Sequence, residues 1–143
     1  MSWVRIPPSP YFTMKKYSID EAQILIKKIH PIVKDIKAKA HDYSRYHIEA
    51  SRLVANFRNS PYDRDGVLDK IMNTRKELRD IMNQLEGYSV ILRDIEHGTV
   101  DILSQFEGDE VMLCCRIFEE SEIGWFHNID EPCSRRRPLK KED

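Results

Sequence analysis

A long apolar stripe with heptad-like spacing constrains this chain more than any other feature. It begins after Ser18 and recurs in steps of three or four residues toward Asn59. Steps of that size place side chains along one face of an α-helix. The pattern therefore predicts one long amphipathic helix. Its apolar face is formed by Ala22, Leu25, Ile29, Ile32, Ile36, Ala40, Tyr43, His47, Ala50, Val54 and Phe57.

Local signals indicate where this helix starts and whether it continues. Ser18 and Glu21 form an S-x-x-E capping box, in which each residue can satisfy a free amide of the first turn. Pro31 removes one amide donor and crowds the preceding turn. Because the stripe stays in phase on both sides of Pro31, we expect a kink in one continuous helix rather than a break.

A second, shorter helix is predicted after a turn at residues 59–66. Ser60 and Pro61 suit an N-cap and a first helical residue. Gly87 suits a left-handed residue that closes the helix. Two striped helices joined by a short loop predict an antiparallel hairpin over residues 17–87. The apolar positions of the second helix include Leu68, Ile71, Leu78, Met82 and Leu85.

From residue 88 onward, the apolar period changes from helical spacing to two. Short alternating segments separated by glycine or acidic turns are typical of an antiparallel meander. Such a sheet can bury one face and leave the other in water. The predicted fold class is therefore α+β, a helical hairpin with a small C-terminal antiparallel meander. The segments predicted as strands are residues 88–95, 99–103, 111–118 and 123–129.

Length and composition fit a single domain. The chain has 143 residues, which is enough for one compact domain and short for two. Its residues are 41% hydrophobic and 33% charged, which suits helices with much solvated surface and is too apolar for disorder. We expect a single domain over residues 1–143. Its parts are an extended Pro-rich arm at 1–16, the hairpin at 17–87, the sheet at 88–130 and a basic tail at 131–143.

Charge and hydropathy disfavour several classes of partner. The formal net charge is -1 and both signs alternate along the chain, so nucleic acid is an unexpected partner. The local exception is the tail, with its basic residues Arg135, Arg136, Arg137, Lys140 and Lys141. No segment approaches the roughly 20 apolar residues that cross a bilayer, so we expect no membrane association. The sequence also has no GxGxxG or GxxxxGK[ST] motif, which disfavours nucleotide chemistry.

Three cysteines, Cys114, Cys115 and Cys133, do not form a disulfide framework, since their number is odd and their spacing does not repeat. Reduced thiols and a cytoplasmic location are the expectation. A zinc site built from Cys114, His127, Asp130 and Cys133 was weighed. The sequence has no CxxC pair, so we predict no metal and no cofactor. A nucleophilic Cys133 activated by the following arginines lacks an evident oxyanion hole.

The richest polar constellation lies in the C-terminal half. A meander could gather His127, Asp101 and Glu120 as candidate catalytic groups. Arg137, with His127 and Trp125, could bind a small anion, because a guanidinium donates two parallel hydrogen bonds to a carboxylate or phosphate. The alternative is a structural network in which Arg137 attaches the tail to Asp101. The spacing of these residues does not decide between an anion site and a structural network.

Several motifs together resemble an uncharacterised prokaryotic family, the one catalogued as domain of unknown function 2203. The resemblance implies a shared fold and a shared site, and it implies no particular reaction. This sequence departs from the family pattern at Cys115 and at Trp125. It also departs in the loop that contains Cys133, because the family has glycines in that loop. The motifs are Tyr11-Phe12-Thr13, Glu21-Ala22, Pro31, Gly87, Asp94, the G-x-V-D of Gly98 to Asp101, Leu113-Cys114, Glu120, His127 and the R-R-P-L of Arg136 to Leu139.

Two hypotheses of function follow. The first is an interaction or scaffold module that forms a homodimer, because the first helix outruns the second and would leave an apolar surface uncovered. That surface would consist of Leu25, Ile29, Ile32 and Ile36. The second is a small-molecule binder or enzyme that takes an anion at His127 and Arg137. Whether the protein is an enzyme is left open by the sequence.

Overall fold

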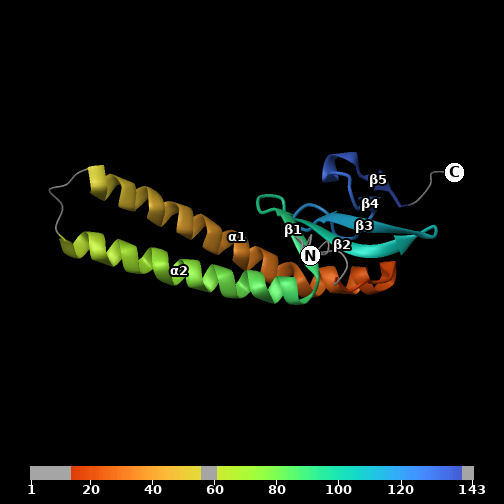
Figure 1. Ribbon diagram of the computed structural model, residues 1–143, viewed down its shortest axis with the longest axis horizontal. Helices are drawn as coiled ribbons and strands as arrows, with labels where there is room; N and C mark the ends of the chain where they lie inside the picture. Colours follow the sequence, from red (N-terminus) through yellow and green to blue (C-terminus); the bar gives the residue numbers. More distant parts are fainter. Residues whose placement is uncertain (1–13, 56–60, 140–143) are drawn as a thin grey trace, which may run out of the picture. The chain divides into compact units, whose positions relative to one another are not determined.

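The computed structural model contains two long helices followed by a five-stranded sheet (Figure 1). It describes residues 14–55 and 61–139, without the side chains of residues 54, 55 and 61–65. Several predicted features lie outside the described residues. They are residues 1–13 of the predicted arm, the side chain of Val54, and all of Phe57, Ser60, Lys140 and Lys141. The chain divides into two compact units. The hairpin unit comprises residues 28–87, and the sheet unit comprises the chain before residue 28 and after residue 87.

Helix α1 (Ile19–Ala55) is continuous through Pro31, as the unbroken stripe predicted. The capping box forms at its start. The Ser18 amide donates to Glu21 Oε1 at 2.8 Å, and the Glu21 amide donates to Ser18 Oγ at 3.0 Å. These hydrogen bonds lower the pKa of the Glu21 carboxyl. Because they satisfy two orphan amides, they explain why the helix begins at this point.

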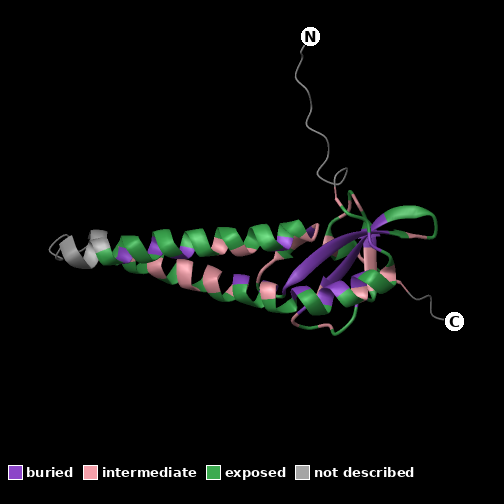
Figure 2. Cartoon of the chain, turned by 90° about the horizontal axis from the view of Figure 1, so that it is seen from below, coloured by how far each residue is buried: buried purple, intermediate pink, exposed green. Residues whose placement is uncertain are grey.

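The hairpin unit is formed by α1 from residue 28 onward and by α2 (Pro61–Gly87). Its buried side chains follow the predicted stripes only in part. Ile29, Ile36, Ile71 and Leu85 are predicted stripe residues, whereas Val33, Val67 and Thr74 lie beside predicted positions. Leu68 and Met82, which we expected on the apolar face of the second helix, are 45% and 47% exposed. Figure 2 shows the buried positions as bands along largely exposed helices. The prediction that Gly87 takes a left-handed backbone is wrong. The residue with positive φ is Ser89, at 59°, and its Oγ accepts a hydrogen bond from the Lys15 amide at 3.0 Å.

The surface on which we based self-association is buried within the single chain. Leu25 is 6% exposed, and Ile29 and Ile36 are both 0% exposed. The homodimer therefore stays a prediction that has lost its original support.

The sheet is fully antiparallel, with its strands in chain order, which confirms the predicted meander. It continues past residue 130. Part of the expected tail forms a short 3-10 helix, η2 (Cys133–Arg135), and the fifth strand. The strands are β1 (Val90–Asp94), β2 (Thr99–Phe106), β3 (Asp109–Arg116), β4 (Trp125–Asn128) and β5 (Arg137–Pro138).

A two-residue turn fixes which side chains share a face of this sheet. Glu107 and Gly108 both have positive φ, at 53° and 86°, which is the type I′ geometry that matches strand twist. The turn pairs Asp101 with Cys114 in the β2–β3 register. Opposite residues in an antiparallel pair lie on the same face, so Asp101 and Cys114 are neighbours. The other face carries apolar Val100, Ile102, Val111 and Leu113.

Contacts distant in sequence complete the sheet unit. The Gln23 amide donates from Nε2 to the Ile123 carbonyl at 2.9 Å and accepts from the Ile123 amide at 2.8 Å. The Tyr17 amide donates to the Leu103 carbonyl at 2.9 Å. The first turns of α1 therefore belong to the sheet unit and lie along the sheet (Figure 1). They contribute Ala22, Leu25 and Ile26 to its core.

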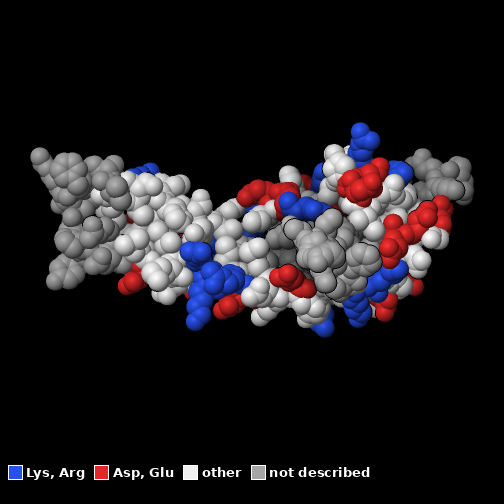
Figure 3. Space-filling view, in the orientation of Figure 1, with Lys and Arg blue, Asp and Glu red and all other residues white. Residues whose placement is uncertain are grey.

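The described helices include none with the length and apolarity needed to cross a membrane. Positive and negative side chains are interspersed on the face shown in Figure 3. That distribution agrees with the alternation of charge along the sequence.

Candidate metal centre

Four potential metal ligands meet at one place in the sheet unit: Asp101, Cys114, His127 and Cys133. They come from β2, β3, β4 and η2. Asp101 pairs with Cys114, and Cys114 pairs with Trp125. His127 follows Trp125 by two residues and therefore lies on the same face. Cys133, on η2, reaches this face from outside the strands.

The distances among the ligand atoms of Asp101, His127 and Cys133 are close to the edges of a tetrahedron around zinc. All four atoms lie within 4.8 Å of one another. Cys133 Sγ lies 3.7 Å from His127 Nε2 and 3.6 Å from Asp101 Oδ1, and His127 Nε2 lies 3.1 Å from both carboxylate oxygens. Zinc bonds of about 2.3 Å to sulfur and about 2.0–2.2 Å to nitrogen or oxygen imply ligand separations of roughly 3.3–3.8 Å.

Burial makes this cluster unusual for polar groups. Asp101, Cys114 and His127 are 0% exposed, whereas Cys133 is half-buried. A buried carboxylate without a countercharge is costly, so the cluster has to contain compensating positive charge. Part of that charge comes from Arg93, whose Nε donates to Asp101 Oδ2 at 2.8 Å.

The hydrogen bond of the other ring nitrogen orients His127. Its Nδ1 lies 2.7 Å from the Asn128 carbonyl oxygen. A carbonyl can only accept, so Nδ1 carries the proton and donates. In the neutral ring, Nε2 then presents a lone pair toward a carboxylate that also presents only lone pairs. That arrangement needs a cation or a proton between the two groups. An Nδ1–H donated to a carbonyl is also the usual second-shell support of a histidine that binds metal.

Arg93 reaches Asp101 from the neighbouring strand. Ile91 is opposite Asp101 in the β1–β2 pair, and Arg93 follows Ile91 by two residues, so strand alternation places Arg93 on the same face. The register then passes from Leu92 opposite Val100 to Asp94 opposite Thr99, so Arg93 is the extra residue of a bulge. Bulges are frequent beside functional sites.

Both thiols have raised pKa values. Burial raises the pKa of Cys114, and the negative charge of Asp101 adds to the effect. Burial and Asp101 also raise the pKa of Cys133. This direction is opposite to the one that the nucleophile hypothesis for Cys133 requires, because reactive thiols have lowered pKa values. It therefore argues against nucleophilic catalysis by Cys133.

The structure separates Arg137 from this cluster. Arg137 is opposite Phe126 in the β4–β5 pair, so it lies on the face away from His127. Its Nη2 donates to Glu131 Oε1 at 3.1 Å and to Asn128 Oδ1 at 3.2 Å. The predicted joint site of His127 and Arg137 is therefore wrong, and so is the alternative contact between Arg137 and Asp101.

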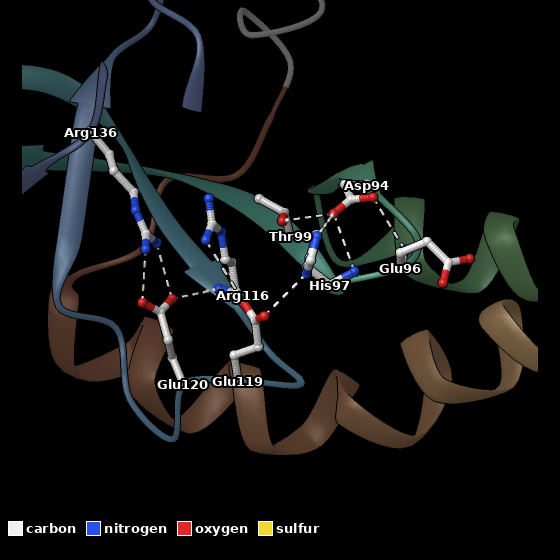
Figure 4. A network of polar contacts seen from close by, with 8 residues as sticks. All are labelled: Asp94, Glu96, His97, Thr99, Arg116, Glu119, Glu120 and Arg136. Atoms are coloured by element: carbon white, nitrogen blue, oxygen red, sulfur yellow. Dashed lines mark hydrogen bonds and ion pairs between the residues drawn. The ribbon is translucent and has the colours of Figure 1, made fainter. Parts of the chain in front are cut away.

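Glu120 and Trp125 belong to a second network, which contains the arginine that sequence reasoning overlooked. Arg136 donates from both Nη atoms to the two carboxylate oxygens of Glu120, each at 3.0 Å (Figure 4). Its guanidinium also lies 4.6 Å from the Trp125 ring centroid. The Arg116 amide donates to Glu120 Oε1 at 2.7 Å. This set fixes the C-terminal segment to the sheet.

A cleft opens beside Cys133. Its volume is about 910 Å³, within the size range of small-molecule sites. Asp130, which the sequence offered as a zinc ligand, lies in the wall of this cleft and outside the four-residue cluster. The lining residues are Arg93, Asp94, His97, Thr99, Arg116, Ile129, Asp130, Glu131, Pro132 and Cys133.

Residues 15–139 match the family described as "Uncharacterized conserved protein (DUF2203)". The chain belongs to this family. The match confirms the resemblance predicted from the sequence motifs and covers both units. No curated protein and no solved structure gives a significant match.

Three of the clustered residues stand in motifs that carried the family resemblance: Asp101, Cys114 and His127. The fourth, Cys133, stands in the loop where this chain departs from the family pattern. The sequence analysis considered Cys114, His127 and Cys133 as zinc ligands, with Asp130 in place of Asp101, and set the site aside because it has no short ligand pair. The symmetry of the β2–β3 hairpin was the available signal, since Asp101 and Cys114 are equidistant from the turn at Glu107 and Gly108.

Proposed function

We propose that this protein binds a divalent transition metal, with zinc as the best fit, through Asp101, Cys114, His127 and Cys133. One observation carries the proposal: four ligand atoms of suitable type lie within 4.8 Å of one another at a buried position. The sequence led us to expect no metal because it has no paired ligand spacing. Ligands supplied singly by β2, β3, β4 and η2 leave no such spacing.

The donor set supports a borderline-soft metal. Two sulfurs and one imidazole suit zinc, whereas magnesium and calcium require mainly oxygen ligands. Charge supports the same choice. A dication with two thiolates and one carboxylate leaves one negative charge, and Arg93 at Asp101 balances it. A metal-free cluster would instead need a proton between the imidazole and the carboxylate.

Four protein ligands form a closed coordination sphere, which is typical of structural zinc rather than catalytic zinc. Cys133 is the one ligand outside the strands, so an ion here would attach the η2 loop to β2, β3 and β4. We propose a metal-stabilised binding module whose loop position depends on the ion. Thiol ligands require reducing conditions, which supports a cytoplasmic location as part of the proposal.

Cobalt substitution and metal analysis test this proposal directly. The wild-type chain should bind one equivalent of zinc, and the cobalt form should show tetrahedral d–d bands with thiolate charge-transfer absorption. Cys114→Ala and Cys133→Ala should each abolish the thiolate absorption or weaken zinc binding by at least tenfold. Cys115→Ala is the matched control, because Cys115 is equally buried and adjacent in sequence but lies on the other sheet face.

Two outcomes would contradict the metal centre. One is a wild-type chain that binds no zinc under reducing conditions. The other is zinc binding that survives in Cys114→Ala and is lost in Cys115→Ala. Circular dichroism of each variant separates lost ligation from lost folding.

We also propose self-association, now supported by a different surface of the hairpin unit. Leu68, Met72 and Met82 on α2 are 45%, 68% and 47% exposed. Their spacing places them on one face of the helix. Exposed apolar side chains aligned in this way are typical of contact surfaces. Light scattering over a wide concentration range tests it, since a constant mass of 16.9 kDa would rule out a dimer.

A further inference from the structure

We infer that the cleft beside Cys133 binds a small oxyanion, a phosphate or carboxylate group, through Arg116 and His97 with Thr99 between them. This anion site is distinct from the metal centre, since none of the three residues belongs to the proposed ligand set. It also replaces the site that we predicted at Arg137.

The three residues lie together because of the strand register. Thr99 pairs with Arg116 across β2 and β3, so both side chains lie on the face that carries Asp101. His97 belongs to the turn that leads into β2. Arg93 lies on the same face and adds a second guanidinium to the cleft lining. The donor groups of the cleft therefore come from β1, from the turn before β2, from β2 and from β3, at one end of the sheet.

Arg116 is loosely held. Among the described residues, its guanidinium makes one ion pair, from Nη1 to Glu119 Oε2 at 3.8 Å, which is too long for a hydrogen bond. Its side chain is 42% exposed, whereas that of Arg136, with two bonds to Glu120, is 14% exposed. A guanidinium has five donors, so Arg116 retains the capacity to bind an oxyanion in a two-pronged manner.

Glu119 occupies the position that a ligand carboxylate would take. Its Oε1 lies 3.1 Å from His97 Nδ1, and its Oε2 is the partner of Arg116 (Figure 4). One carboxylate on a turn thus contacts both proposed binding groups, although its side chain is 47% exposed. An oxyanion in the cleft would compete with Glu119 for the same donors.

Two of the three acidic residues that line the cleft, Asp94 and Glu131, accept several hydrogen bonds from neighbouring groups. Asp94 accepts from the amides of Glu96 and His97, both at 3.2 Å, and from the Thr99 hydroxyl at 3.4 Å. Glu131 accepts from the Asn128 amide at 2.9 Å and from Arg137 at 3.1 Å. Their negative charge is offset by these donors, so they oppose an incoming anion less than their number implies.

Titration with sodium phosphate, followed by backbone amide NMR shifts, tests the inference. At equal ionic strength, phosphate should give saturable shifts at residues 97–99 and 116, and sodium chloride should not. Sodium acetate in a parallel titration distinguishes a carboxylate preference from a phosphate preference. Arg116→Gln should weaken binding by at least tenfold. Arg135→Gln, which removes an equal charge from exposed η2 outside the cleft lining, should leave it unchanged.

A variant with the opposite expected sign sharpens the test. Glu119→Gln should bind the favoured anion several-fold more tightly, because it removes the internal competitor. Shifts that follow ionic strength alone, or equal binding by Arg116→Gln and wild type, would overturn the inference. Both titrations are run on zinc-treated and on chelator-treated protein. Anion binding that is the same in both samples is independent of the metal centre, so the two proposals can fail separately.

Discussion

The hairpin unit and the sheet unit are stabilised by cores of different chemistry. In the described part of the hairpin unit, the buried residues are apolar except Thr74. The sheet unit buries Thr99, Asp101, Ser104 and His127 among its apolar side chains. An apolar core needs only volume and pattern, whereas a buried polar group needs a specific partner. The buried polar residues of the sheet unit are therefore ones that an apolar core would not require.

Removing the buried carboxylate should have the largest effect and tests this contrast most directly. Asp101→Leu leaves His127 and Arg93 without their acceptor, so metal-free protein should lose about 3–5 kcal/mol of unfolding free energy. Thr74→Val in the hairpin unit should change stability by less than about 1 kcal/mol. Urea unfolding followed by Trp125 fluorescence, in a Trp3→Phe background, measures the sheet unit for Asp101→Leu. Hydrogen exchange measures the hairpin unit for Thr74→Val. Equal small losses would remove the distinction between the two cores.

Metal should act on one unit only. At free zinc of about 100 times its dissociation constant, the sheet unit should gain about 2.7 kcal/mol. Amide hydrogen exchange should slow at residues 99–103, 112–116 and 125–128, while the hairpin at 28–87 exchanges as before. Cys114→Ala should abolish this protection. Protection spread equally over both units would show that the ion acts elsewhere.

Two adjacent arginines provide a smaller, matched comparison within the sheet unit. Arg136→Gln breaks a half-buried two-pronged pair with Glu120 and should cost about 1–3 kcal/mol. Arg137→Gln removes an exposed pair with Glu131 and should cost less than about 0.5 kcal/mol. Thermal or urea unfolding of both variants at neutral pH measures the difference. A larger stability loss in Arg137→Gln than in Arg136→Gln would show that Arg137, and not Arg136, is the main attachment of the C-terminal segment.

The pH dependence of the Arg136 pair follows from the Glu120 carboxyl. Burial alone would raise its pKa, but hydrogen bonds from Arg136 and the Arg116 amide bring it below its ordinary value of 4.5. The stabilisation is therefore present above pH 4.5 and is lost as pH falls through the lower folded-state pKa. The difference between wild type and Arg136→Gln should shrink over that acidic range. A difference that stays constant to low pH would exclude Glu120 as its source.

The smallest effect on stability is expected on the exposed face of α2. Changing Leu68 and Met72 together to Gln should alter unfolding free energy by about 0.5 kcal/mol or less, because both side chains are exposed. If the hairpin unit self-associates through this face, the mass from light scattering should fall toward 16.9 kDa. A dimer unaffected by the double change would place the contact elsewhere.

The same contrast explains how much the sequence could predict. Helical spacing, the Ser18–Glu21 box and the change to period two defined the hairpin and the meander, because local pattern determines them. The cluster depends on register, which a single turn at Glu107 and Gly108 sets. Arg93 was missed because its contact with Asp101 depends on the β1–β2 register, and Arg136 was confused with Arg137 because sequence alone did not reveal which face each would occupy.

The hydrogen bonds between Gln23 and Ile123 join residues 100 positions apart. The sheet unit is thus assembled from two separated pieces of chain, and the whole hairpin unit is synthesised between them. At about 5–20 residues per second, the first turns of α1 wait roughly 5–20 s on the ribosome before their partners emerge. During that interval Ala22, Leu25 and Ile26 lack the strands that complete their core. The apolar end of α1 is therefore made before the whole hairpin unit and is covered only after it.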